Sequence, residues 1–343
     1  MAQGESVMSI TVNQQSRRIG LALSGGGFRA AGFHLGVFRK LKELGLLWKL
    51  DLLTCVSGGS IAGAFLARHW GQEEALDKLE NYLRTTSIAV SSVLGGLLDP
   101  LHSRLDKLAS SYDRDLFDGG TLDTLKSGPR IYLNATNLAT GNMFFFVAGG
   151  DGLSEMGEWE MGTVAAGTFP ISRAVAASSA FPPVFPPLRL AQDEYPQRDA
   201  DFVCLTDGGV YDNLGVNPLL RKRNALDYVI VSDGGKPFAI DQSPTELGSV
   251  ILVHAIDILM EQVRGLQFKR LELNGAKAGG AKPAWLSIDS IEGQVRDGDA
   301  AFASSISTNL QRLSVAEVDV LKRHAGALVE HRLRTYMPEL LGS

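Results

Sequence analysis

The chain has 343 residues, of which 45% are apolar and 21% charged, and its formal net charge is −5. This composition is typical of an ordinary globular protein, and the lack of a basic excess argues against a nucleic acid polymer as the main partner. No basic stretch followed by an apolar one opens the chain, and no apolar run has the length of a membrane span, so a cytoplasmic protein is expected. Cys55 and Cys204 fall near the ends of expected strands, which favours buried thiols over a disulfide or a metal site.

The chain is expected to form one domain. No internal repeat, low-complexity tract or linker divides it, and its length suits a large α/β domain with a well-buried core. Residues 1–16 are expected to be a flexible or loosely docked arm, and residues 17–343 the single domain.

A strand, a helix and a second strand follow the arm. Residues 18–23 form a short apolar strand, residues 28–44 carry apolar side chains at helical spacing, and residues 50–55 are again apolar. This order is typical of a β-α-β unit. We therefore expect an α/β fold with a parallel sheet, whose functional loops gather at the carboxyl ends of the strands.

Three consecutive glycines, Gly25, Gly26 and Gly27, join the first strand to its helix. With the residues that follow they match a relaxed dinucleotide-binding pattern, but the next strand does not end in the acidic residue that would hold a ribose. The Gly-Lys-Ser/Thr of a phosphate-binding loop is also missing. What remains is a run of backbone N–H groups at a helix N-terminus, which can stabilise an oxyanion. The alternative is that the glycines only allow the helix to pack closely on the sheet.

The second strand runs into a turn of small residues and then into a helix rich in alanine and leucine. Gly58, Gly59 and Ser60 give this turn the form of a nucleophile elbow, in which a strained turn presents one hydroxyl group at a helix N-terminus. We expect Ser60 to lie at the turn and to be the nucleophile. The alternative is an ordinary turn in which Ser60 caps the helix.

The rest of the chain continues to alternate between helices and strands. Helices are expected at residues 73–84, 170–180 and 243–273, with two more in residues 300–336, and strands at residues 131–136, 143–147, 202–205, 228–232 and 284–288. Residues 85–98 carry no charge, and two interpretations stay open for them. They form either a core helix with a glycine break or an apolar lid that meets lipid.

A serine nucleophile needs a group that takes its proton. Only His254, His324 and His331 follow the turn in the chain order of a Ser-Asp-His triad, and each falls inside an expected helix. Two carboxylates are better placed, because Asp207 and Asp233 each end a buried strand and are each followed by two glycines. Spacing in the sequence does not separate these two candidates.

Taken together, these segments resemble the patatin-like phospholipases. The resemblance consists of a Gly-Gly-Gly-x-Arg loop, a Gly-x-Ser-x-small elbow one strand later and a distant Asp-Gly-Gly, and it covers residues 18–235. Further segments agree in order, at residues 134–141, 176–185 and 207–215. Two positions depart from the family pattern: Ser24 stands where many members have aspartate, and Ala62 where the elbow usually has glycine.

The resemblance implies a three-layer α/β/α sandwich with a mainly parallel central sheet. It implies a Ser–Asp dyad that acts without histidine, metal or cofactor. Carried over by position, the implied roles are nucleophile for Ser60, base for Asp207, oxyanion donors for Gly25, Gly26 and Gly27, and support for Arg29, Gly58 and Gly59. The longer Asp-Gly-Gly-Val-Tyr-Asp-Asn context selects Asp207 over Asp233.

The implied function is a serine hydrolase of the phospholipase A type, which cleaves fatty-acyl esters of membrane phospholipids during transient contact with the inner membrane surface. Residues 240–343 lie outside the shared motifs. Similarity to regulated bacterial members implies control by a cyclic nucleotide, and a homo-oligomer is left open. Two alternatives remain: a Ser-His-Asp esterase that uses His254, and a lipid-binding or regulatory protein without turnover.

Overall fold

A computed structural model describes residues 9–12, 14–88, 101–196, 200–235, 237–238 and 248–342. Its centre is a ten-stranded mixed sheet, in which strands run in the order β12-β11-β3-β4-β5-β6-β7-β8, with β10 paired to β5 and β9 paired to β10. The strands are β3 (Ile19–Leu23), β4 (Leu52–Val56), β5 (Arg130–Asn137), β6 (Met143–Ala148), β7 (Glu155–Glu158), β8 (Gly162–Ala165), β9 (Leu188–Ala191), β10 (Phe202–Asp207), β11 (Tyr228–Asp233) and β12 (Lys282–Ser287).

The five strands from β12 to β5 are parallel, and the remaining strands pair antiparallel. In the parallel strands β3 and β4 every residue is buried, because helices cover both faces of this part of the sheet. The predicted α/β fold with a mainly parallel central sheet is confirmed. The antiparallel part is larger than expected, since β7, β8 and β9 were not predicted.

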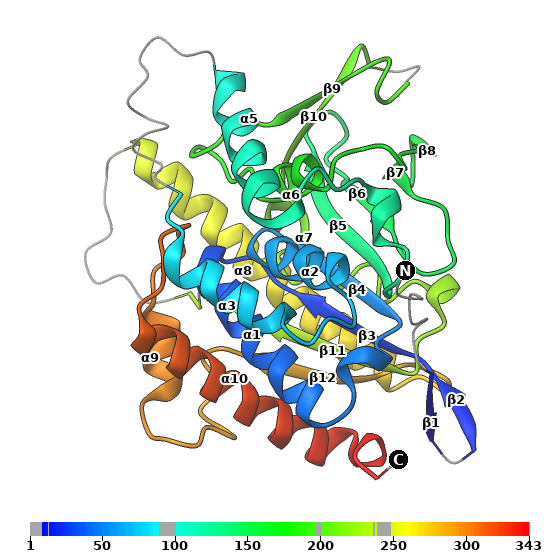
Figure 1. Ribbon diagram of the computed structural model, residues 1–343, viewed down its shortest axis with the longest axis vertical. Coiled ribbons are helices and arrows are strands. Elements are labelled where there is room, and N and C mark those ends of the chain that lie inside the picture. The colour runs from blue at the N-terminus through cyan, green and yellow to red at the C-terminus, as the bar shows by residue number, and fades with distance from the viewer. Residues whose placement is uncertain are drawn as a thin grey trace.

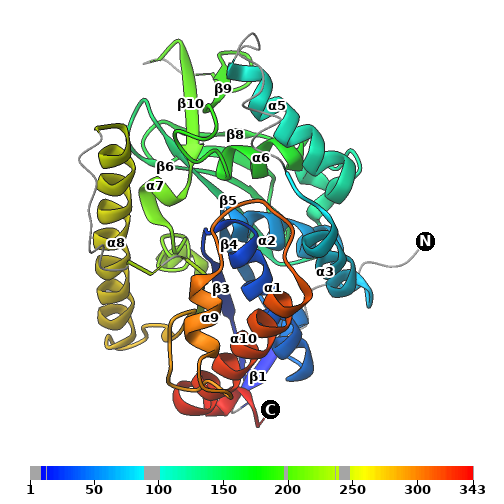
Figure 2. The ribbon, with the colours of Figure 1, turned by 90° about the vertical axis from the view of Figure 1, so that its left-hand side faces the viewer.

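Helices lie on both sides of the sheet, as the three-layer prediction requires. Figure 2 shows α8 on one side of the strands and α1, α3 and α10 on the other. The helices are α1 (Gly27–Glu43), α2 (Gly58–Arg68), α3 (Ala75–Thr85), α5 (Leu101–Tyr112), α6 (Ile171–Ser178), α7 (Gly209–Asp212), α8 (Gly248–Gly275), α9 (Asp299–Ser305) and α10 (Val315–Tyr336). Their N- to C-terminal order can be followed by colour in Figure 1.

The larger part of the core lies between the sheet and the helices on the α1 side. Helix α1 contributes three fully buried aromatic side chains, Phe28, Phe33 and Phe38, because it is enclosed by the sheet, α2 and α10. A smaller apolar cluster fills the opposite face, where Leu271 of α8 joins residues of β3, β4 and β11. Packing on both faces of the sheet therefore fixes the positions of the C-terminal ends of its strands.

Three further expectations can be compared with the structure. Within the predicted arm, β1 (Ile10–Val12) pairs antiparallel with β2 (Gln15–Arg17), and Ile10 and Val12 are buried. Most of the uncharged segment 85–98 lies outside the described residues. The part of the chain that the structure describes has no helix with the length and apolar character of a membrane span. Both cysteines are free, and Cys55 is buried.

Candidate active site

The strained turn lies at Ser57, three residues before the predicted position. Strand β4 ends at Val56, helix α2 begins at Gly58, and Ser57 between them has φ 51° and ψ −115°. A residue with a side chain rarely adopts this conformation, at a cost of about 1–3 kcal/mol, and such residues cluster at functional sites. A nucleophile elbow has the same construction, with the serine itself at the strand-to-helix turn. The prediction that Ser60 lies at the turn is wrong.

Two glycines force the turn into this position. A Cβ atom at Gly58 would lie 2.2 Å from the carbonyl oxygen of Gly27, and one at Gly59 would lie 2.2 Å from the carbonyl oxygen of Leu23. The start of α2 therefore packs directly on the backbone of the β3–α1 loop, which no residue with a side chain would allow. Gly59 is the elbow glycine, two residues after Ser57.

Ser60 lies inside the first turn of α2 and is fully buried. Its Oγ is 2.7 Å from Oγ of Ser178, at the end of α6. The Ser178 hydroxyl donates to the carbonyl oxygen of Asn134 at 2.6 Å and accepts the N–H of Ser57 at 3.0 Å. Because the Ser178 proton is already used, Ser60 donates to Ser178. This arrangement ties α2 to α6 and holds the backbone of Ser57.

Strand β5 brings Asp207 next to the turn. Asn134 of β5 pairs with Val56, the last residue of β4, and the following residue Ala135 pairs with Asp207, the last residue of β10. Strands β4 and β10 therefore lie end to end beside β5 and run in opposite directions. Their C-terminal ends meet at Ser57 and Asp207. Residue spacing alone does not predict this meeting, because it depends on an antiparallel strand in line with a parallel one; only the family resemblance implied that a serine and Asp207 meet.

Asp207 has the properties of a general base. Its Oδ1 accepts the N–H of Gly209 at 2.7 Å, while its Oδ2 is buried without a well-aligned donor in the described part of the chain. Burial raises the pKa of Asp207 to about 7, and hydrogen bonding from Gly209 and from the nearby Ser57 side chain opposes this rise. A base with a pKa near 7 and one free oxygen suits proton transfer at neutral pH.

The glycine loop lies directly beside Ser57. A Cβ atom at Gly25 would lie 3.2 Å from Cβ of Ser57. The N–H of Gly25 donates to the carbonyl oxygen of Asn213, so Gly25 is not a free oxyanion donor. Gly26 and Gly27 have φ 137° and 60°, and within the described chain their N–H groups donate to no recorded acceptor. These two groups, at the start of α1, are the ones that can hold an oxyanion.

Arg29 supports the loop from behind. Its side chain is buried and donates to the carbonyl oxygens of Gly234 and Ile306, which joins α1 to the end of β11 and to the segment after α9. Burial lowers the pKa of Arg29 to about 10, so the guanidinium stays charged at neutral pH. The N–H of Phe28 donates to the carbonyl oxygen of Asn309, which further fixes the start of α1.

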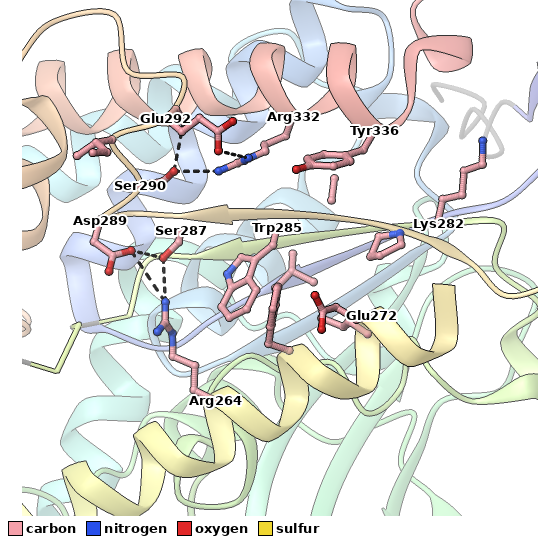
Figure 3. A pocket seen from close by; sticks show the side chains of 16 residues that line it. Arg264, Glu272, Lys282, Trp285, Ser287, Asp289, Ser290, Glu292, Arg332 and Tyr336 are labelled. Atoms are coloured by element: carbon pink, nitrogen blue, oxygen red, sulfur yellow. Dashed lines mark hydrogen bonds and ion pairs between the residues drawn. The ribbon is translucent and has the colours of Figure 1, made fainter. Parts of the chain in front are cut away.

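Asp233, the second candidate base, is fully engaged. Its Oδ2 accepts from Nε of Arg264 at 2.7 Å and from Nε1 of Trp285 at 3.2 Å, and its Oδ1 accepts the N–H of Gly235. Arg264 and Trp285 line a groove of about 720 Å³ between α8, β12 and α10, shown in Figure 3. With both oxygens occupied by donors, Asp233 is a structural ion-pair partner and not an available base.

Histidine does not take part in the described site. No histidine side chain among the described residues bonds to Ser57, Ser60 or Asp207. His34 lies beneath the glycine loop between the carbonyl oxygen of Ser24 and Oγ of Ser232, and burial lowers its pKa to about 4, so it is neutral. Nor do the described His, Cys, Asp and Glu side chains gather in a group that could ligate a metal ion.

Comparison with known families agrees with this geometry. The model of the patatin-like phospholipases matches residues 21–220, which is more than half of the chain. The chain belongs to the patatin-like phospholipase family. The match includes the glycine loop, the turn at Ser57 and Asp207, and it ends before α8. No curated protein sequence matches the chain.

Solved structures share the fold at low sequence identity. Human GIVD cytosolic phospholipase A2 in complex with methyl γ-linolenyl fluorophosphonate and terbium chloride has a TM-score of 0.57 and 14% identity, over 94% of this chain and 59% of that one. A second structure of human GIVD cytosolic phospholipase A2 has a TM-score of 0.55 and 14% identity, over 95% of this chain and 59% of that one. This patatin-like chain thus spans about three fifths of the length of those proteins.

Sequence reasoning missed Ser57 and Ser178. A signal for Ser57 was present, because it directly follows the last apolar residue of the strand and precedes two glycines. The Gly-x-Ser-x-small pattern at Gly58 to Ala62 drew attention to the later serine instead. Ser178 carried no signal, since its contacts with Ser57 and Ser60 join residues more than 100 positions apart.

Proposed function

We propose that this protein is a serine lipid acyl hydrolase that cleaves fatty-acyl esters of membrane phospholipids, with Ser57 as nucleophile and Asp207 as base. The observation that carries the proposal is the strained conformation of Ser57 at the strand-to-helix turn, between the glycine loop and Asp207. Ser57 is partly exposed, whereas Ser60 is fully buried, so a substrate reaches Ser57 more readily. Membership of the patatin-like family supports an ester bond of a lipid as the target.

The reaction follows from the positions of these groups. Oδ2 of Asp207 takes the proton of the Ser57 hydroxyl as its Oγ attacks the ester carbonyl carbon. The N–H groups of Gly26 and Gly27 stabilise the negative charge that develops on the carbonyl oxygen. The lysophospholipid alcohol leaves with the proton from Asp207. Water then gives a proton to Asp207 as its oxygen attacks the acyl carbonyl carbon. The bond to Ser57 Oγ breaks, the fatty acid leaves, and Asp207 returns the proton to Ser57 Oγ.

The proposal changes the predicted dyad at one position. Ser60 keeps a positioning role through Ser178, which holds the N–H of Ser57. In the proposal Gly58 and Gly59 allow the close approach of α2 to the glycine loop.

The decisive experiment compares two serine-to-alanine variants. The wild-type protein is treated with a fluorophosphonate probe, and peptide mass spectrometry locates the label. We expect the label on Ser57, loss of ester turnover by about 10³-fold or more in Ser57→Ala, and turnover within about tenfold of wild type in Ser60→Ala. A label on Ser60, with full activity in Ser57→Ala, would restore the Ser60–Asp207 dyad.

The same assay separates the alternatives. A folded wild-type protein with no label and no turnover would support a lipid-binding protein without catalysis. Loss of activity in His254→Ala, a change on α8, would support the Ser-His-Asp esterase. Control by a cyclic nucleotide and cytoplasmic location with transient membrane contact stay predictions. Turnover unchanged by a panel of cyclic mono- and dinucleotides would contradict such control.

A further inference from the structure

The first half of α8 presents an apolar surface without charge. Four large apolar side chains in this half of the helix are exposed, namely Ile251 at 46%, Leu252 at 68%, Ile258 at 47% and Leu259 at 65%. Ala255, also exposed, lies between them on the same face. The one charged residue between positions 248 and 260, Asp257, is only partly exposed and has an interaction of its own. We call Ile251, Leu252, Ala255, Ile258 and Leu259 the apolar patch.

The second half of the helix differs in its neighbours. Leu266 and Leu273 continue the row of leucines at seven-residue spacing and are 66% and 55% exposed. However, apart from Phe268, which is 38% exposed, most of the exposed residues around them are polar or charged, including Lys269, Arg270 and Glu272. Single apolar side chains among charges are common on protein surfaces, whereas a contiguous apolar patch marks an interaction site.

The helix that carries the apolar patch packs against the candidate active site. Met260, next to Leu259, extends its Cε to within 3.2 Å of where a Cβ of Gly209 would lie. Gly209 in turn donates its N–H to Oδ1 of Asp207. Figure 2 shows α7, which begins at Gly209, lying beside the upper turns of α8. Met260, the residue after Leu259, therefore lies next to Gly209, and Gly209 binds the proposed base.

We propose that the apolar patch docks on the surface of a phospholipid bilayer and so brings the partly exposed Ser57 close to its substrate. This inference rests on the proposed function, since an enzyme that attacks membrane phospholipids must meet its substrate at the bilayer. The patch exposes no lysine or arginine, so insertion of apolar side chains, and not attraction to anionic lipid, provides the binding. A second copy of the chain is less suitable, because charges interrupt the leucine row beyond residue 260.

Vesicle binding by two matched double variants tests the proposal. Leu252→Glu/Leu259→Glu removes the centre of the patch, and Leu266→Glu/Leu273→Glu makes the same change in the same leucine row, outside the patch. Each variant is sedimented with phosphatidylcholine vesicles and assayed on a soluble p-nitrophenyl ester. We expect the first pair to lose vesicle affinity by at least about tenfold and the control pair to bind like wild type. Both should hydrolyse the soluble ester within about twofold of wild type.

Other results would overturn the proposal. These are absence of vesicle binding by the wild type, equal loss in both variant pairs, or binding that disappears at high salt or requires phosphatidylglycerol. A wild-type dimer that dissociates in the first pair, with vesicle binding unchanged, would identify the patch as a subunit interface instead. Leu252→Gln/Leu259→Gln replaces the first pair if the glutamates impair folding, as judged by circular dichroism. Sedimentation needs no turnover, so an inactive wild type that still binds vesicles through the patch would contradict the proposed function alone.

Discussion

Two segments of this molecule have the same Asp-Gly-Gly sequence and different surroundings, and we propose opposite roles for them. Both Asp207 and Asp233 end a strand, both are nearly inaccessible, and each accepts the N–H of the second following glycine. Asp233 also accepts hydrogen bonds from Arg264 of α8 and from Trp285 of β12. Asp207 has no such partners in the described part of the chain, and its Oδ2 is available to the Ser57 hydroxyl. The difference shows that what packs against a carboxylate, more than its local sequence, decides whether it is an ion-pair partner or a base.

The largest expected effect separates the two aspartates by activity. Asp207→Asn removes the proposed proton acceptor of Ser57, so kcat/KM for a soluble ester should fall by about 10²–10⁴-fold. Asp233→Asn should leave kcat/KM within about tenfold of wild type, because Asp233 contacts Arg264 and Trp285 and not the serine. Steady-state kinetics on both purified, folded variants measure this. Similar losses in the two variants would remove the distinction between the loops.

The loop with Asp233 should matter more for stability than for activity. Arg264→Met leaves the buried carboxylate of Asp233 without its ion-pair partner, which should lower the free energy of unfolding by about 3–5 kcal/mol. Urea denaturation measures this change, and Asp233→Asn/Arg264→Met should recover part of the loss. A loss below about 1 kcal/mol, the value of an exposed pair, would show that Arg264 does not neutralise Asp233.

The pH dependence should identify Asp207 in two ways. Its pKa is raised by burial to about 7, so the folded state holds the proton more tightly than the unfolded chain does. The stability that this proton provides is fully present below about pH 4 and is lost as the pH rises through 7. Asp207→Asn should therefore gain stability over wild type between pH 4 and 8, by an amount on the order of 4 kcal/mol.

Activity should follow the same ionisation in the opposite direction. Ester turnover by the wild type should rise as Asp207 loses its proton, with its midpoint near pH 7. Thermal unfolding and kcat/KM, each followed across this pH range, provide the two measurements. A constant difference in stability between wild type and Asp207→Asn would contradict a raised pKa.

The smallest effect concerns the support of the Ser57 turn. Ser60→Ala removes one buried hydroxyl pair with Ser178, so the free energy of unfolding should fall by about 1 kcal/mol. Ser57→Ala serves as the matched control, because it removes a hydroxyl at the same turn without breaking that pair. Chemical denaturation should show a larger loss of the free energy of unfolding for Ser60→Ala than for Ser57→Ala. A larger loss for Ser57→Ala would contradict this role of the Ser60 hydroxyl.

Much of the fold could be read from local patterns. The strands around the glycine loop and the helices α1 and α10 were predicted because apolar spacing and end signals act within a few residues. The hairpin β1–β2 and the short strands β7, β8 and β9 were missed. Short strands gain their stability from distant partners, so their own sequences carry little signal.

The sequence by itself determined the parts of the candidate site: the glycine loop, the small-residue turn after the second strand, and two Asp-Gly-Gly segments. Only the tertiary structure decided how these parts combine. The close approach of Gly58 and Gly59 to the backbone of the β3–α1 loop placed the strained turn at Ser57 and buried Ser60. The register along β5 brought Asp207 to that turn. Such contacts join residues far apart in the chain, so no local pattern encodes them.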